Sequence, residues 1–145
     1  MDFETSMKIS ASGLAAHRTW INVVSANLAN VNTTRASNGE PYRRKTVVYE
    51  SIPVSEQFGQ SLDNALEEDL QKVQVQQIVA DGRDFKQVHD PSHPDAGDDG
   101  IVQMPNINPV EEMANLMIAT RSYEANLAAL NMAKQLAVKA LEIGK

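Results

Sequence analysis

The last quarter of the chain, residues 108–143, reads NPVEEMANLMIATRSYEANLAALNMAKQLAVKALEI. Asn108 can cap a helix, Pro109 suits the first helical position, and Glu111 stands where a capping-box acid belongs. From there apolar residues recur at alternating steps of three and four, which is the spacing of one helix face. The segment therefore predicts a single helix about 50 Å long, at 1.5 Å per residue.

This helix has two apolar stripes. The first stripe passes through Met113, Leu116, Tyr123, Leu127, Leu130 and Leu141. The second stripe passes through Ile118, Ala125, Ala129, Met132, Leu136, Ala140 and Ile143. The two are offset by about two residues, or about 200° of rotation, so they lie on nearly opposite faces. We expect the first stripe to form a seam within the chain and the second to contact other subunits.

A second helix is predicted near the N-terminus, from Thr5 to Asn32. Its heptad pattern predicts a seam at Met7, Leu14, Ile21, Val24 and Leu28. Behind this seam, the candidate contacts with other subunits are Ile9, Val23, Asn27 and Asn30. Asparagine so near a seam favours either helix termination at the surface or hydrogen bonds that fix the register across helices.

The segment between the helices has a different character. Residues 1–36 have a net charge of +1, residues 37–107 of −7 and residues 108–145 of 0, which add up to −6. Within the acidic part, β-like runs occur at 46–49, 73–76 and 85–88, and turn residues fill 90–100. Phe58, Leu62, Leu66 and Leu70 could form one face of a short helix or belong to an acidic loop.

The predicted fold class is mainly α with a small β-rich insert. It comprises an N-terminal helix in 1–36, an acidic β-rich insert in 37–107 and a C-terminal helix in 108–145. The two long helices are expected to pair as a coiled-coil-like domain. Each helix has only the other to cover it, so the second face of each lacks a partner within the chain, and exposed apolar surface of this extent indicates an interaction site. The alternative is a monomer in which the insert folds over the second face.

The sequence shows no motif that would support catalysis. It contains no cysteine, no glycine-rich phosphate loop and no nucleophile elbow. His89 and His93 are four residues apart, but Pro91 and Pro94 break any helix that would align them on a metal. We therefore expect no enzyme activity, no cofactor and no metal. Arg43-Arg44-Lys45 lies within an acidic segment, where solvation or pairing with carboxylates is more common than nucleic-acid binding.

No apolar run approaches the 18 residues of a membrane-spanning helix. The start, Met1-Asp2-Phe3-Glu4, lacks the basic and apolar regions of an ordinary secretory signal.

Several motifs carry a family resemblance. The stretch SANLANVNT at residues 25–33 resembles the N-terminal signature of flagellar rod and hook proteins. Further stretches resemble the proximal-rod subunit of that family: residues 39–45, 90–95, 104–113, 122–126 and 139–145. The chain departs from many of these relatives at Thr33-Thr34-Arg35-Ala36, where they have Thr-Pro-Gly-Tyr.

The resemblance implies paired terminal helices with the insert facing outward. It also implies a structural role in the bacterial flagellar basal body, where a helically assembled rod forms the drive shaft from the membrane ring to the distal rod and hook. The implied partners are other rod proteins, further copies of the chain, ring or adaptor proteins at the rod base and the type III export apparatus. The implied location is the periplasmic rod, reached without a cleaved signal peptide, with no nucleic acid bound and no direct membrane span. The alternative is a coiled-coil adaptor or export chaperone that binds an amphipathic partner helix.

Overall fold

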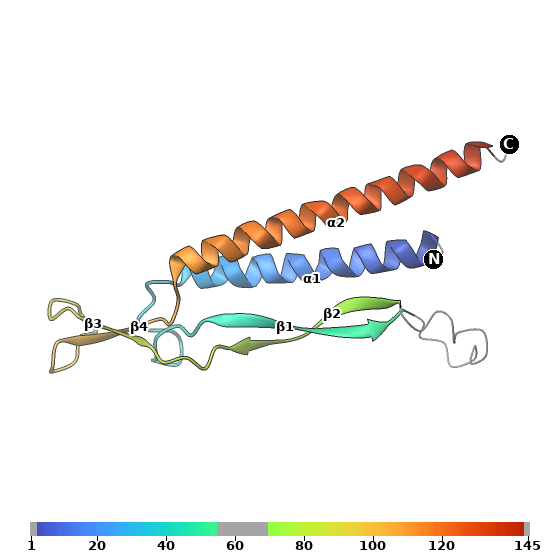
Figure 1. The fold of residues 1–145 in the computed structure, drawn as a ribbon. Coiled ribbons are helices and arrows are strands. Elements are labelled where there is room, and N and C mark those ends of the chain that lie inside the picture. The colour runs from blue at the N-terminus through green and yellow to red at the C-terminus, as the bar shows by residue number, and fades with distance from the viewer. Residues whose placement is uncertain (1–2, 55–69, 144–145) are drawn as a thin grey trace.

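A computed structural model describes residues 3–54 and 70–143 of the chain. The elements, in chain order, are α1 (Phe3–Ala29), β1 (Lys45–Pro53), β2 (Gln71–Ala80), β3 (Lys86–His89), β4 (Ile101–Met104) and α2 (Pro109–Ile143). Two long helices pack together with a small β insert between them in the sequence (Figure 1), which confirms the predicted fold class.

The molecule is elongated, and its main part has three layers. The helix α2 lies on α1, and α1 lies on the hairpin formed by β1 and β2 (Figure 1). Gly13 lies opposite Asn126, and Asn27 lies opposite Glu112. The two helices are therefore antiparallel, and residues after about 136 extend past the beginning of α1.

The start of α2 follows its sequence signals. The backbone N–H of Val110 donates to the Asn108 side chain at 3.1 Å, and the N–H of Glu112 donates to the Asn108 carbonyl at 3.0 Å. The first bond satisfies one of the N–H groups that a helix leaves unpaired at its N-terminus, and the second is the first backbone bond of the helix itself. Pro109 is the first helical residue, as expected.

The insert forms two separate antiparallel hairpins. Strands β1 and β2 pair from Lys45 opposite Ala80 to Pro53 opposite Gln71, and the register shifts between Val48 and Tyr49. A shift of this kind is a β-bulge, which increases the local twist of the strands. Strands β3 and β4 form the second hairpin, which points away from the helices (Figure 1).

The sequence predicted three of these strands and missed the fourth. The run at 46–49 lies in β1, the run at 73–76 lies in β2, and most of the run at 85–88 lies in β3. The missed strand, β4, is the short alternating run Ile101-Val102-Gln103-Met104 directly after the turn residues. Phe58, Leu62 and Leu66, the core of the possible short helix, lie outside the described residues.

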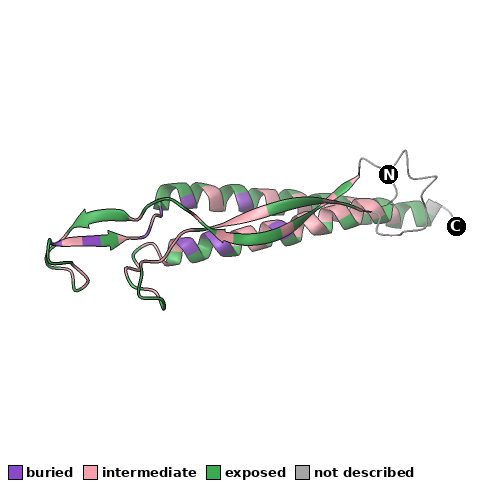
Figure 2. Ribbon diagram, turned by 90° about the horizontal axis from the view of Figure 1, so that it is seen from below, coloured by how far each residue is buried: buried purple, intermediate pink, exposed green. Residues whose placement is uncertain are grey.

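Helix α1 is covered on one side by α2 and on another by the hairpin, and its buried positions are purple in Figure 2. Ala16 and Val23 are buried and line the side that faces the hairpin. Val24 is buried on the side of α1 that carries Asn27 and faces α2. The insert thus covers the second face of α1.

A buried polar junction joins the three layers near the C-terminal end of α1. Asn27 and Glu112 are fully buried, and the Asn27 side-chain amide donates to Glu112 Oε2 at 2.9 Å. The same amide donates to the Lys45 carbonyl at 2.8 Å, while Asn27 Oδ1 accepts the Lys45 N–H at 2.9 Å. Asn27 therefore pairs with the first residue of β1 as a neighbouring strand would, and it also holds α2.

The charge of Glu112 is balanced by Arg44. Arg44 Nε donates to Glu112 Oε1 at 2.8 Å, and its terminal nitrogen lies 2.8 Å from the same oxygen. A second terminal nitrogen of Arg44 lies 3.3 Å from Asp81, directly after β2. This pairing agrees with the expectation that the basic run at 43–45 meets carboxylates. Arg43 instead stacks over Phe85, with 4.3 Å from its guanidinium carbon to the ring centroid.

Removing the Glu112 carboxylate should destabilise the fold strongly. Glu112→Ala would leave Asn27 and Arg44 without their shared acceptor, and breaking a buried pair costs about 3–5 kcal/mol. Urea unfolding of the purified chain measures this loss. Glu124→Ala is the matched control, because Glu124 is an exposed acid on the same helix. A Glu112→Ala variant as stable as the control would contradict the importance of the junction.

Acid should weaken the junction through Asp81. Hydrogen bonds from the side chain and backbone of Arg83 lower the pKa of Asp81 from 3.8 to about 2. Because the folded-state pKa is depressed, this contribution is complete above the unfolded-state pKa of about 4. It is lost as the pH falls from about 4 to 2. Asp81→Asn should therefore flatten the pH dependence of the free energy of unfolding in that window. An unchanged pH dependence would contradict the stabilising role of the Asp81 carboxylate.

Candidate assembly surface

The seam between α1 and α2 is a heptad pattern of small, polar and large residues. The α2 positions that are buried or half-buried include Glu112, Leu116, Ala119, Tyr123, Asn126, Leu130, Ala133 and Ala137. They alternate by four and three residues, the spacing of a coiled-coil seam. The predicted seam positions Leu116, Tyr123 and Leu130 belong to this line.

Three other positions predicted for the seam lie off this line or beyond it, and they are exposed. Met113 and Leu127 are each one residue past a seam position, namely Glu112 and Asn126. Leu141 is exposed where α2 extends past the beginning of α1. Size favours the largest apolar residue at each turn, whereas the seam contains the residue that allows the closest approach of the helices.

Gly13 shows how close this approach is. A Cβ atom built on Gly13 would lie 3.0 Å from Asn126 Nδ2, which is tighter than most real Cβ contacts. Glycine at this position therefore lets the two helices pass each other closely. This explains the glycine in the interior of α1, where it costs about 1 kcal/mol relative to alanine.

On α1 the line that faces α2 is marked by Gly13 and Asn27, which are two heptads apart. Val24 lies close to this line and is buried. The other predicted seam residues of α1 are half-buried on a flank about 60–120° from the line: Met7, Leu14, Ile21 and Leu28.

The second stripe of α2 is uncovered. Ile118 is 54% exposed, Met132 63% and Leu136 69%. Ala125, Ala129 and Ala140 on the same stripe are also exposed, and the side chain of Ile143 lies outside the described part of the chain. Among the described helices and strands, α2 packs only against α1. The two helices therefore differ, because the insert covers the second face of α1 and leaves that of α2 open.

Two of the predicted contacts of α1 with other subunits, Val23 and Asn27, need correction. Val23 is buried beside the hairpin, and Asn27 has no exposed surface left for a neighbour. Asn27 does bond across helices, but to Glu112 of its own chain. Ile9 and Asn30 are half-buried, so their contacts with other subunits stay predictions; the Asn30 side chain bonds to the Ala26 carbonyl and to Thr33. The sequence could not distinguish Val23 and Asn27 from assembly contacts, because it does not show where the hairpin and α2 lie.

The histidine-containing loop after β3 is held together by its own hydrogen bonds. Asp90 accepts bonds from the Ser92 N–H and hydroxyl, which lower its pKa. His93 Nδ1 accepts the Asp95 N–H at 3.1 Å, and Asp95 accepts the Thr34 hydroxyl at 2.7 Å. Within residues 3–54 and 70–143, no group of three His, Cys, Asp or Glu side chains is placed to hold a metal ion. In the same ranges, no helix combines the length and the apolar character needed to span a bilayer.

Two family profiles of known proteins match the chain. The profile of the family described as "Flagella basal body rod protein" matches residues 7–36. The profile of "Flagellar basal body rod FlgEFG protein C-terminal" matches residues 98–143. The two matches cover α1 with the turn that follows it, and β4 with α2.

Relatives match over nearly the whole chain. The flagellar basal-body rod protein FlgC of Bacillus subtilis is 47% identical, with 97% of each chain covered. The FlgC protein of Borreliella burgdorferi is 37% identical, over 99% of this chain and 98% of its own. That of Salmonella typhimurium is 36% identical over 94% of each.

These matches favour a rod subunit over the alternative of an adaptor or export chaperone. They include the insert as well as the helices, so the likeness is not limited to a generic coiled coil. The chain belongs to the family of flagellar basal-body rod proteins FlgC and is a structural subunit of the rod.

Proposed function

We propose that this subunit assembles into the rod through the uncovered face of α2. The residues of this face are Ile118, Ala125, Ala129, Met132, Leu136 and Ala140, and we call them the α2 ridge. The observation that carries the proposal is the exposure of its three large apolar side chains, each more than half accessible. Exposed apolar surface that follows one helix face is typical of a protein–protein contact.

The internal construction of the chain supports a mechanical role. The buried junction ties α1, α2 and the hairpin into one unit, so that a force applied to one layer is transmitted to the others. A rod that links the membrane ring to the distal rod and hook as a drive shaft has to transmit torque in this way. The role requires no catalysis, and we assign the chain no enzymatic activity.

The proposed partners follow from the family. We infer contacts with other rod proteins, with further copies of this chain and with ring or adaptor proteins at the rod base. We also infer export by the flagellar type III apparatus without a cleaved signal, to a periplasmic position in the rod. The basal-body rod location in the names of the relatives supports this inference.

Leu136→Asp should abolish rod assembly without unfolding the monomer. Leu136 is exposed in the isolated chain, and surface substitutions usually change stability by less than about 0.5 kcal/mol. In the assembled rod the carboxylate would be desolvated without a partner, at a cost of several kcal/mol. We expect normal secretion, no rods and no swimming, measured by secretion and motility assays together with electron microscopy of basal bodies.

Leu130→Asp provides the contrast, because Leu130 lies in the seam with α1. This variant should lower the thermal stability of the purified monomer, whereas Leu136→Asp should not. Normal rods built from Leu136→Asp chains would refute the role of the α2 ridge.

Deleting residues 2–8 should impair export more than folding. We infer from the family resemblance that export information lies near the N-terminus, and the buried junction at Asn27 and Glu112 is far from the deletion. We expect the shortened chain to accumulate inside cells with most of its helical content intact. Secretion of the shortened chain at the level of the full-length chain would contradict the location of export information near the N-terminus.

A further inference from the structure

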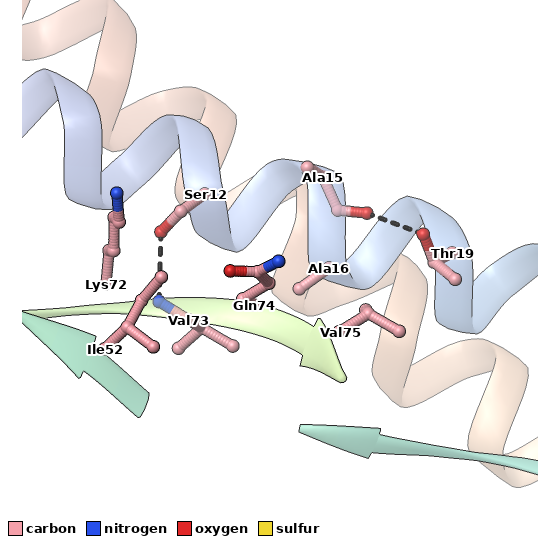
Figure 3. A pocket seen from close by; sticks show the side chains of 9 residues that line it. All are labelled: Ser12, Ala15, Ala16, Thr19, Ile52, Lys72, Val73, Gln74 and Val75. Atoms are coloured by element: carbon pink, nitrogen blue, oxygen red, sulfur yellow. Dashed lines mark hydrogen bonds between the residues drawn. The ribbon is translucent and has the colours of Figure 1, made fainter. Parts of the chain in front are cut away.

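A long groove runs between α1 and the β1–β2 hairpin, on the side of α1 away from α2. It consists of two adjoining hollows of about 360 Å³ and 590 Å³ that share Thr19. In the first hollow, Ser12, Ala15 and Ala16 of α1 face Val73 and Val75 of β2 (Figure 3). Ala15 lies about 160° around α1 from Gly13, which faces α2. The chain's own α2 therefore cannot reach this groove.

The second hollow continues along the same helix face. Its helical wall is formed by Thr19, Asn22, Val23 and Ala26, and Ile78 of β2 lies across from them. Val73 in the first hollow is 42% exposed, and Ile78 in the second is 48% exposed. The groove is thus a concave, mostly apolar surface with a large exposed side chain in each hollow.

We infer that this groove receives the α2 ridge of a second copy of the chain. The inference rests on the proposed role of the α2 ridge and adds the surface that it contacts. On the ridge, Ile118 and Met132 are fourteen residues apart, which is about 21 Å along the helix. The groove extends from Ser12 to Ala26, which is also fourteen residues and about 21 Å.

The two surfaces also match in side-chain size. The midpoint of the ridge stretch from Ile118 to Met132 is Ala125, and the midpoint of the groove is Thr19, where the two hollows meet. With the midpoints together, the small Ala125 lies over Thr19, and the larger Ile118 and Met132 reach the two hollows. Alanine at such a crossing lets a helix approach its neighbour closely.

Half of the docked stretch of the ridge is uncharged. Helix α2 has no charged residue from Ala125 to Ala133, so these turns can be buried without desolvating an ion. The two charged residues between Ile118 and Ala125, Arg121 and Glu124, have opposite signs. The charged residues that line the hollows are Lys45 and Lys72. Lysine can bury its aliphatic stem while its ammonium group stays in water.

The geometry of the two surfaces selects a second copy that is added head to tail. The ridge and the groove are different surfaces on different elements of one molecule, so the contact between them is heterologous. Such a contact leaves a free ridge on one subunit and a free groove on the other, and assembly continues as a ring or a helix. A twofold dimer would instead place ridge against ridge and would end there.

Cysteine cross-linking tests this contact directly, because the chain has no cysteine of its own. The double variant Thr19→Cys/Ala125→Cys pairs the two midpoints, so it does not depend on the direction in which the ridge lies in the groove. It is expressed as the only copy in cells, and basal bodies from motile cells are oxidised with copper phenanthroline. A disulfide needs Cβ atoms about 4 Å apart. We expect a ladder of dimers and higher multimers of this chain on a non-reducing gel, and monomer from each single variant.

The matched control is Thr19→Cys/Glu124→Cys. Glu124 is adjacent to Ala125 in the sequence but about 100° further around α2, and it is exposed. This control should give at least a tenfold weaker ladder. Dimers from Ala125→Cys alone would show ridge-to-ridge contact and overturn the inference. Monomers only, or a cross-link to another rod protein, would also overturn it, while the motility of the cells would leave the proposed rod role intact.

A second set of variants covers the case in which the midpoint pair does not assemble. Ala26→Cys at one end of the groove is combined with Ile118→Cys or with Met132→Cys. One of these two pairs should cross-link, and that pair gives the direction of the ridge. Cross-linking of both pairs, or of neither, would overturn the inference.

Discussion

The fold depends on the buried pairing of Asn27 with Glu112 and the first residue of β1. A fully buried carboxylate is costly unless it is paired and hydrogen-bonded. Here its oxygens accept from the Asn27 amide and from the Arg44 guanidinium. Since these groups come from α1, α2 and the start of the insert, their geometry is satisfied only when all three are in place. Buried polar contacts of this kind are specific in a way that the alanine-rich seam is not.

Once the junction is formed, the two helices are no longer equivalent. The hairpin begins at Lys45, which is held against α1 by Asn27, and it therefore continues along α1. Ala16 and Val23 are buried by this contact, whereas Met132 and Leu136 on α2 receive no cover from the chain. The placement of one strand thus decides which helix face is internal and which is available to other molecules.

The sequence predicted the pattern of elements better than it predicted the contacts. The caps and periodicity of α2, the length of α1 and the position of β1 follow from local chemistry, and the structure has them. The predicted seam is one residue away from the observed seam at Met113 and Leu127, because large apolar side chains are expected to be the buried ones. A glycine, an asparagine and a glutamate form parts of the seam instead. Val23 and Asn27 were misplaced for another reason, since the residues that cover them are far along the chain: Ile78 lines the same hollow as Val23, and Lys45 and Glu112 hold Asn27.

The distribution of polar and apolar groups suits a subunit that folds first and assembles afterwards. Its strongest directional contacts, between Arg44, Glu112 and Asp81, are internal, so they are complete before any neighbour arrives. The ridge left uncovered on α2 is made of apolar side chains, and such a surface gains stability in proportion to the area buried. A single ridge contact is non-directional and weak, while many repeated contacts along a rod add up. Because the directional and non-directional interactions are separated in this way, the monomer can remain folded on its own and the assembled rod can still be stable.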